Sequence, residues 1–128
     1  LLKKGNRRAL HLFGVGEGAA IEVDTLGVTP KRVKLGGEAT LRVQLHSTKK
    51  RAQRLRLEYA IGYARPSGRP GRKVFKIADV ALASGGSVEF TRKLSFVDRT
   101  IRTHYAGRHT LTLIVNGQAH GEVTFTLV

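Results

Sequence analysis

Hydrophobic residues recur at every second position through most of the chain. Leu41, Val43 and Leu45 alternate with polar residues, and Tyr59 and Tyr63 fall on the apolar side of a longer alternating stretch. A period of two is typical of half-buried antiparallel strands, because successive side chains of a strand point to opposite faces of the sheet. The sequence therefore predicts an all-β fold. The stretches with this pattern cover 21–23, 39–45, 54–63, 75–82, 88–96, 111–115 and 123–127.

Turn-forming residues separate these stretches at intervals of roughly 10–15 residues. Asn116-Gly117 is the strongest turn signal, since a two-residue hairpin turn needs the positive φ angles that Asn and Gly adopt readily. Within 75–82 the apolar positions change parity, which predicts a bulge or turn near Ala78-Asp79. About seven short strands with this spacing predict an Ig-like antiparallel β-sandwich, and a small barrel is the alternative.

The first residues of the chain have a different character. Basic and leucine residues in 1–13 suggest the end of a preceding helix, or a short helix over 7–13. Residues 14–18 are rich in glycine, but without a strand before them and a helix after them they indicate a linker and not a phosphate-binding loop. The chain contains no Met, even at position 1. We therefore expect a piece of a longer protein, with 1–18 as the helix end and linker of a preceding helical domain and 19–128 as the sandwich.

The chain is strongly basic. Its 23 Lys and Arg residues against nine Asp and Glu residues give a formal net charge of +14. Such a charge favours phosphate-rich partners or an anionic membrane surface. No transmembrane segment or secretory signal is recognisable. Cys is absent, which excludes disulfides and thiolate metal sites. We expect a cytoplasmic protein that needs no membrane, metal or small-molecule cofactor.

The expected strand order predicts at which end of the sandwich the basic residues gather. Successive loops of a meandering sandwich alternate between its two ends, so the loops at 27–38, 64–73 and 97–108 share one end. Ten of the 23 basic residues lie in these loops. Arg suits an anion-binding role, because its planar guanidinium group can donate to two phosphate oxygens at once. The candidate contact residues are Arg65, Arg69, Arg72, Lys73, Arg99, Arg102, His104 and Arg108. Lys31, Arg32 and Lys34 belong to the same end.

A few residues have two interpretations. Arg92, on an apolar face, either leans out to solvent at a strand end or pairs with Asp98. Tyr105 either forms a tyrosine corner, as in Ig-like sandwiches, or stacks on a base or sugar. His104 and His109 are too few for a zinc site and are interpreted as ordinary polar or phosphate-contacting residues. We identify no catalytic constellation and expect no catalytic residue in this chain.

Several short motifs occur in a fixed order in the second half of the chain. They are Lys73-Val74-Phe75-Lys76, Ser95-Phe96, Arg99-Thr100, His104-Tyr105-Ala106-Gly107-Arg108-His109 and Val115-Asn116-Gly117. Together they resemble the C-terminal part of bacterial DNA alkylation repair proteins of the AlkC type. The resemblance extends over most of residues 19–128. The family usually has Tyr-Pro-Gly where this chain has Tyr105-Ala106-Gly107, which affects the stiffness of that turn.

The resemblance implies a parent DNA glycosylase, a hydrolase that removes alkylated bases such as 3-methyladenine. Its HEAT-like repeats would hold the duplex and supply the catalytic acid, so no catalytic residue can be assigned to this chain. The Ig-like domain would complete the clamp around the DNA. We therefore expect an accessory domain that grips the sugar-phosphate backbone of alkylated duplex DNA without reading its sequence.

The alternative is a protein-interaction module that docks on the missing HEAT-like repeat domain of the same parent chain. Ile114 has the outward parity of its strand, and Leu10 and Phe13 lie in the junction. Under this alternative these three apolar residues mark the docking seam, and the charge is incidental.

Overall fold

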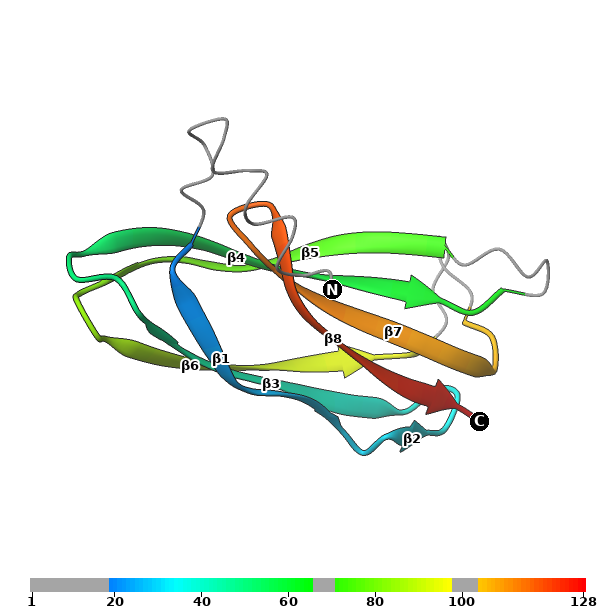
Figure 1. Ribbon diagram of the computed structural model, residues 1–128. Coiled ribbons are helices and arrows are strands. Elements are labelled where there is room, and N and C mark those ends of the chain that lie inside the picture. Colours follow the sequence, from blue (N-terminus) through cyan, green and yellow to red (C-terminus); the bar gives the residue numbers. More distant parts are fainter. Residues whose placement is uncertain (1–18, 66–70, 98–103) are drawn as a thin grey trace.

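The computed structural model describes residues 19–65, 71–97 and 104–128. This part of the chain forms eight strands (Figure 1). They are β1 (Ile21–Thr29), β2 (Arg32–Val33), β3 (Glu38–Ser47), β4 (Gln53–Tyr63), β5 (Gly71–Leu82), β6 (Ser87–Ser95), β7 (Gly107–Val115) and β8 (Gln118–Leu127). The helix expected over 7–13 lies outside the described residues. Within the described ranges no helix is long and apolar enough to cross a membrane.

The strands form two sheets that pack face to face. One sheet has three strands in the order β1-β3-β6, and the other has five in the order β2-β8-β7-β4-β5. Every paired neighbour is antiparallel except β2 and β8. The predicted Ig-like β-sandwich is confirmed. Its core consists of the inward residues of both sheets, including Leu45, Leu57, Leu111 and Leu113, and Tyr59 and Tyr63 are buried as expected.

β2 is the strand that the sequence did not predict. Its two residues are too short to show any period, and it forms only because the chain crosses from the small sheet to the edge of the large one. There it pairs with β8 in parallel. Thr126 N–H donates to the Lys31 carbonyl at 2.8 Å, and Val128 N–H donates to the Val33 carbonyl at 2.8 Å. Val33 is buried at 2% exposure and anchors the strand.

The expected irregularity in the fifth strand is present, one residue before the predicted position. β5 is continuous, but Leu57 pairs with Ala78 while Glu58 pairs with Lys76, which leaves Ile77 as a bulge residue. Arg92 Nη2 donates to the Ile77 carbonyl at 2.9 Å. Arg92 thus fastens β6 to β5 across the two sheet edges, a role that neither interpretation foresaw. Asp98, the other suggested partner, lies outside the described residues.

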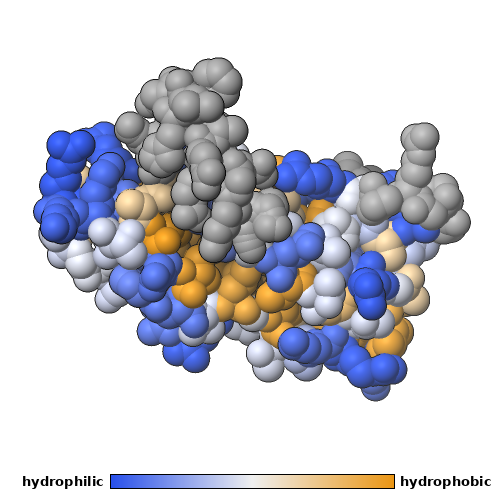
Figure 2. All heavy atoms as spheres, viewed as in Figure 1, coloured by the Kyte–Doolittle hydropathy of each residue, from blue (hydrophilic) through white to orange (hydrophobic). Residues whose placement is uncertain are grey.

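Figure 2 shows how polarity is distributed over one face of the molecule. Hydrophilic residues lie at both ends of the sandwich, and hydrophobic residues are visible along its middle, where β1 and β8 lie. Ile21, Val23 and Leu26 on β1 and Val123 on β8 are partly buried against the core. Packing of β1 against β8 therefore closes the sandwich on this side.

Candidate nucleic-acid interface

The antiparallel pairing brings three connections to one end of the sandwich. β1, β4 and β6 end there, and β3, β5 and β7 begin there, beside β2 and the last residue of the chain (right in Figure 1). We call this the cationic end, defined by seven exposed basic residues. They are Lys31, Arg32, Lys34, Arg65, Arg72, Lys73 and Arg108.

Four of the predicted contact residues are exposed at the cationic end, namely Arg65, Arg72, Lys73 and Arg108. Three of these four differ from the expectation in one respect, because they belong to strands and not to loops. β5 begins at Gly71 and β7 at Gly107, so Arg72, Lys73 and Arg108 are held by sheet hydrogen bonds. Arg69, Arg99 and Arg102 lie outside the described residues.

His104 is a correction to the predicted contact set. The structure buries it at 8% exposure, with its ring 5.6 Å from that of Tyr63 and 5.4 Å from that of Phe96. His109 is fully buried as well, 5.4 Å from the ring of Phe125. Both histidines belong to the aromatic core beneath the cationic end, so neither is a surface group for phosphate. His109 could have been recognised, since it shares the inward parity of Leu111.

Lys31, Arg32 and Lys34 were expected at this end but were left out of the contact set. Their backbone is held from two sides. Leu35 N–H donates to the Val128 carbonyl at 2.9 Å, and Gly36 N–H donates to the Phe96 carbonyl at 3.1 Å. Gly36 has φ of +84°, which places it at the third position of a tight turn closed by Gly37 N–H and the Lys34 carbonyl. The chain therefore presents these cations on a fixed segment.

The sheet register aligns the arginines across neighbouring strands. Arg108 on β7 and Arg32 on β2 both pair with Thr126 of β8, so their backbones lie about 10 Å apart on the outer face. Arg72 on β5 pairs with Gly62 of β4. The backbone of the large sheet thus spaces these arginines before any ligand binds.

Most of the described acidic residues form ion pairs with basic residues that lie outside the cationic end. Glu89 pairs with Arg42, Glu58 with Arg56 and Asp79 with Lys76. Among the residues that the structure describes, Glu38 is the acid nearest to the cationic end by its place on β3, and it faces Lys93 at 3.8 Å. None of the seven cations that define this end has an acidic partner within 4.0 Å among the residues that the structure describes.

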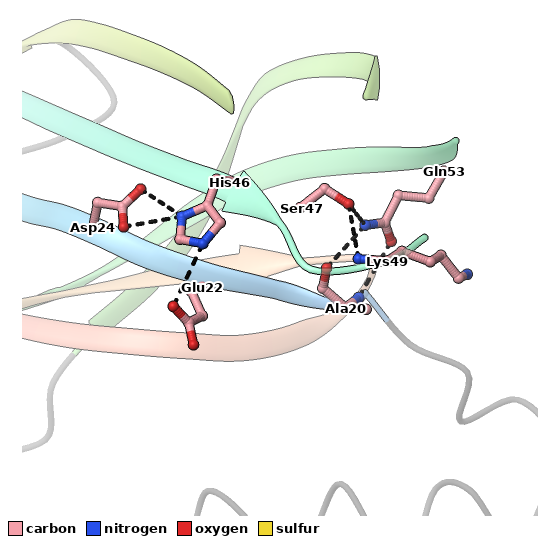
Figure 3. A network of polar contacts seen from close by, with 7 residues as sticks. All are labelled: Ala20, Glu22, Asp24, His46, Ser47, Lys49 and Gln53. Carbon is pink, nitrogen blue, oxygen red and sulfur yellow. Dashed lines mark hydrogen bonds and ion pairs between the residues drawn. The ribbon is translucent and has the colours of Figure 1, made fainter. Parts of the chain in front are cut away.

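Two further acidic residues, Glu22 and Asp24, lie on the outer face of the small sheet, toward the end of the sandwich opposite the cationic end (Figure 3). His46 Nδ1 contacts the Asp24 carboxylate at 2.9 Å, and His46 Nε2 lies 3.5 Å from Glu22. The hydrogen bond with Asp24, with smaller contributions from the charges of Asp24 and Glu22, raises the pKa of His46 above its ordinary 6.5. Asp24 and Glu22 therefore have a local partner in His46. Across the described ranges no group of three His, Cys, Asp or Glu residues could hold a metal ion.

Exposed apolar residues also gather at the cationic end. Leu35, Val97 and Val128 are 45–46% exposed, and Tyr105 is 38% exposed. This exposure does not fit a tyrosine corner for Tyr105. The cationic end thus offers separate cations together with several apolar side chains.

Ile114, suggested as an exposed docking seam, is only 8% exposed in spite of its outward parity.

Fold and charge together define an Ig-like domain with the cationic end described above. A family model described as "Uncharacterised protein YhaZ, C-terminal Ig-like domain" matches residues 22–128, and the chain belongs to this family. It is 38% identical over 125 residues to "Uncharacterized protein YhaZ" of Bacillus subtilis (strain 168), an alignment that covers 98% of this chain and 34% of that protein.

A solved structure extends the comparison. It is the alkylpurine DNA glycosylase AlkC of Pseudomonas fluorescens, bound to DNA containing an abasic site analog. The identity is 38% and the TM-score 0.85, over 99% of this chain and 35% of that protein. This similarity confirms the resemblance that the motifs indicated. The chain spans about a third of the length of both relatives.

Other similar structures share only the fold. A β-glucosidase of Erythrobacter marinus is 16% identical with a TM-score of 0.69, over 86% of this chain and 16% of that one. A β-glucosidase of Listeria innocua is 17% identical with a TM-score of 0.65, over 84% of this chain and 15% of that one.

Proposed function

We propose that the chain is an accessory domain of a DNA alkylation repair protein and grips the sugar-phosphate backbone of duplex DNA. The observation that carries this proposal is the group of seven exposed cations that lack acidic partners among the described residues. Unpaired cations can release the counterions of DNA without first breaking an internal ion pair. The DNA-bound AlkC structure supports the same partner.

The arrangement favours backbone contact over base readout. Arg32 and Arg108 extend from a sheet face and not from a helix or ribbon that could enter the major groove. Threonine hydroxyls, such as that of Thr126 between them, can donate to phosphate oxygens. Exposed Leu35 and Val97 can contact deoxyribose. The domain therefore binds different sequences with similar affinity.

In the parent protein, a HEAT-like repeat domain before this chain supplies the catalytic acid and the other half of the clamp. Alkylated duplex DNA is the common ligand of the two domains, and the bacterial cytoplasm is the compartment. This chain contributes grip and charge placement, not bond cleavage.

The test is fluorescence anisotropy with two unrelated short duplexes over a salt series. Contact with roughly 4–6 phosphates predicts a slope of about −4 to −5 in log affinity against log salt, equal for both sequences. Changing Arg32 and Arg108 to Gln together should reduce that slope by about 2, since each lost phosphate contact removes about 0.9. No binding at low salt would overturn the proposal.

A matched control removes the same charge elsewhere. Arg51 and Arg54 are exposed, form no ion pair within the described part of the chain, and lie toward the opposite end of the sandwich. Changing both to Gln lowers the net charge equally and should leave the slope unchanged. An equal loss in the two double variants would show that total charge, and not the cationic end, determines binding.

A further inference from the structure

The edges of the two sheets separate beside the cationic end. Between β5 and β6 they leave a cleft of about 290 Å3. Its buried floor includes Tyr59, Tyr63 and Phe96, and half-buried Phe75 forms one wall. Exposed Lys73 lines it from β5, and exposed Lys93 lines it from β6. A concave aromatic surface between two cations suits a planar ligand that carries negative charge.

We propose that this cleft binds a single unstacked nucleotide, with the base against the aromatic wall and the phosphate between Lys73 and Lys93. The inference rests on the proposed function, because a strand held at the cationic end brings its nucleotides to the mouth of the cleft. It adds to that function a preference for an unpaired or extruded base next to the gripped backbone.

Phe75 provides the stacking surface. Its ring lies 5.1 Å from that of Tyr59 at an interplanar angle of 18°, so the pair already stacks. Lys73 Nζ lies 5.5 Å from the centroid of the Phe75 ring. This ammonium can move to a phosphate when a base covers the ring. Stacking on an aromatic side chain strengthens binding by roughly five- to 150-fold per base.

The two lysines are available to the phosphate. Within the described ranges, Lys73 has no acidic partner, and the one acidic partner of Lys93 is Glu38, at 3.8 Å. The side chains of Lys93 and Glu38 are 70% and 56% exposed, so their mutual attraction is weak. A phosphate placed between the lysines therefore meets two exposed cations from opposite sheets.

Size and position limit the occupant. A volume of about 290 Å3 lies near the lower bound of ligand pockets, which accommodates one nucleotide and excludes a duplex. The Arg92 hydrogen bond to the Ile77 carbonyl fastens β6 to β5 on the side away from the cationic end. The lining residues lie between this bridge and the cationic end, so the cleft and the backbone grip are adjacent.

The experiment compares two single strands by anisotropy: an oligothymidylate of eight nucleotides, and a strand of equal length and charge in which every base is absent. The chain should bind oligothymidylate roughly five- to 150-fold more tightly. Phe75→Leu should remove this preference and keep the affinity for the baseless strand, whereas Phe75→Tyr should restore it.

Phe90→Leu is the control. Phe90 is also half-buried and also has a cation over its ring, with Arg92 Cζ at 5.7 Å, but it does not line the cleft. This variant should keep the preference. Equal wild-type affinity for the two strands would overturn the cleft as a base site and leave the backbone grip intact.

A third titration tests the cleft by itself if neither single strand binds; the grip on duplex DNA is decided separately, by the salt series with the two duplexes. The probe is free 2-aminopurine deoxynucleoside monophosphate, whose fluorescence falls when the base stacks. Saturable quenching that Phe75→Leu abolishes, and that inorganic phosphate alone does not compete away, would assign the cleft to free nucleotides. Absence of quenching would overturn it.

Discussion

Acidification is expected to destabilise the sandwich through His109. Its side chain has 0% exposure and lies among the rings of Tyr63, Phe96 and Phe125. Nδ1–H donates to the Gly107 carbonyl at 3.1 Å, and buried Nε2 has no hydrogen-bond partner among the described residues. A proton on Nε2 would therefore place an unpaired charge inside the aromatic core.

The sign and the size of the effect follow from this environment. Burial, together with the charge of His104, lowers the pKa of His109 below its ordinary 6.5. Below pH 6.5 His109 binds a proton in the unfolded chain but not in the folded chain. The free energy of unfolding therefore falls as the pH is lowered, until the pKa of His109 in the folded state is reached. At pH 5.5, one unit below the ordinary pKa of 6.5, this loss of stability is at most about 1.4 kcal/mol. For a domain of this size, the loss lowers Tm by roughly 3–6 °C.

His46 works in the opposite direction and must be separated. Its raised pKa means that its interaction with Asp24 stabilises the fold below pH 6.5 and that this contribution is lost as pH rises through the raised value. The assay is urea unfolding near pH 7.5 and near pH 5.5 for wild type, His109→Phe and His46→Gln. His109→Phe should lose less stability on acidification than wild type, by an amount of at most about 1.4 kcal/mol. His46→Gln should lose more.

An equal acid response of wild type and His109→Phe would refute this reasoning, whatever the stability of the variant at neutral pH. That comparison matters because Phe is larger than His and can cost 1–3 kcal/mol by overpacking at both pH values, about equally. The difference between the two pH values cancels this packing cost and isolates protonation.

Two further substitutions test local connections. Gln53→Ala should lower the free energy of unfolding in urea by about 1–3 kcal/mol. The reason is that buried Gln53 donates to the Ala20 carbonyl at 2.9 Å and to Ser47 Oγ at 2.7 Å (Figure 3). A variant as stable as wild type would contradict this prediction. Asn116→Ala should destabilise the hairpin by about 1 kcal/mol more than Asn116→Gly, because Asn116 has φ of +51°, which Gly adopts without strain and Ala does not. Both variants lose the 2.7 Å hydrogen bond from Arg56 N–H, so that loss cancels in the comparison. The reverse order of stability would exclude backbone strain as the cause.

The backbone turn at residue 116 illustrates what a local pattern can predict. Asn116-Gly117 takes the positive φ angles that its composition requires, and the strands on either side keep the expected parity. The position of Arg65, Arg72 and Arg108 at one end follows from strand order alone, because antiparallel neighbours reverse direction at each turn. Alternation, turn chemistry and charge are properties of neighbouring residues, which is why they can be read without the fold.

Partners distant in sequence could not be predicted in the same way. Arg92 binds a carbonyl exposed by a bulge 15 residues earlier, and β2 forms by pairing with the last strand. The short segment around Val33 shows no period of its own, and parity alone does not reveal which main-chain carbonyl a bulge leaves free.

By itself, the sequence determined the all-β class, the positions of the long strands and the end at which the basic residues gather, since these depend on local periodicity and on the order of strands. Only the tertiary structure decided which of the described cations have acidic partners, because pairing depends on cross-strand register, as between Arg42 and Glu89. It also placed His104 in the core and opened the cleft beside Phe75. Burial and concavity arise only when two sheets pack, and no single strand contains that information.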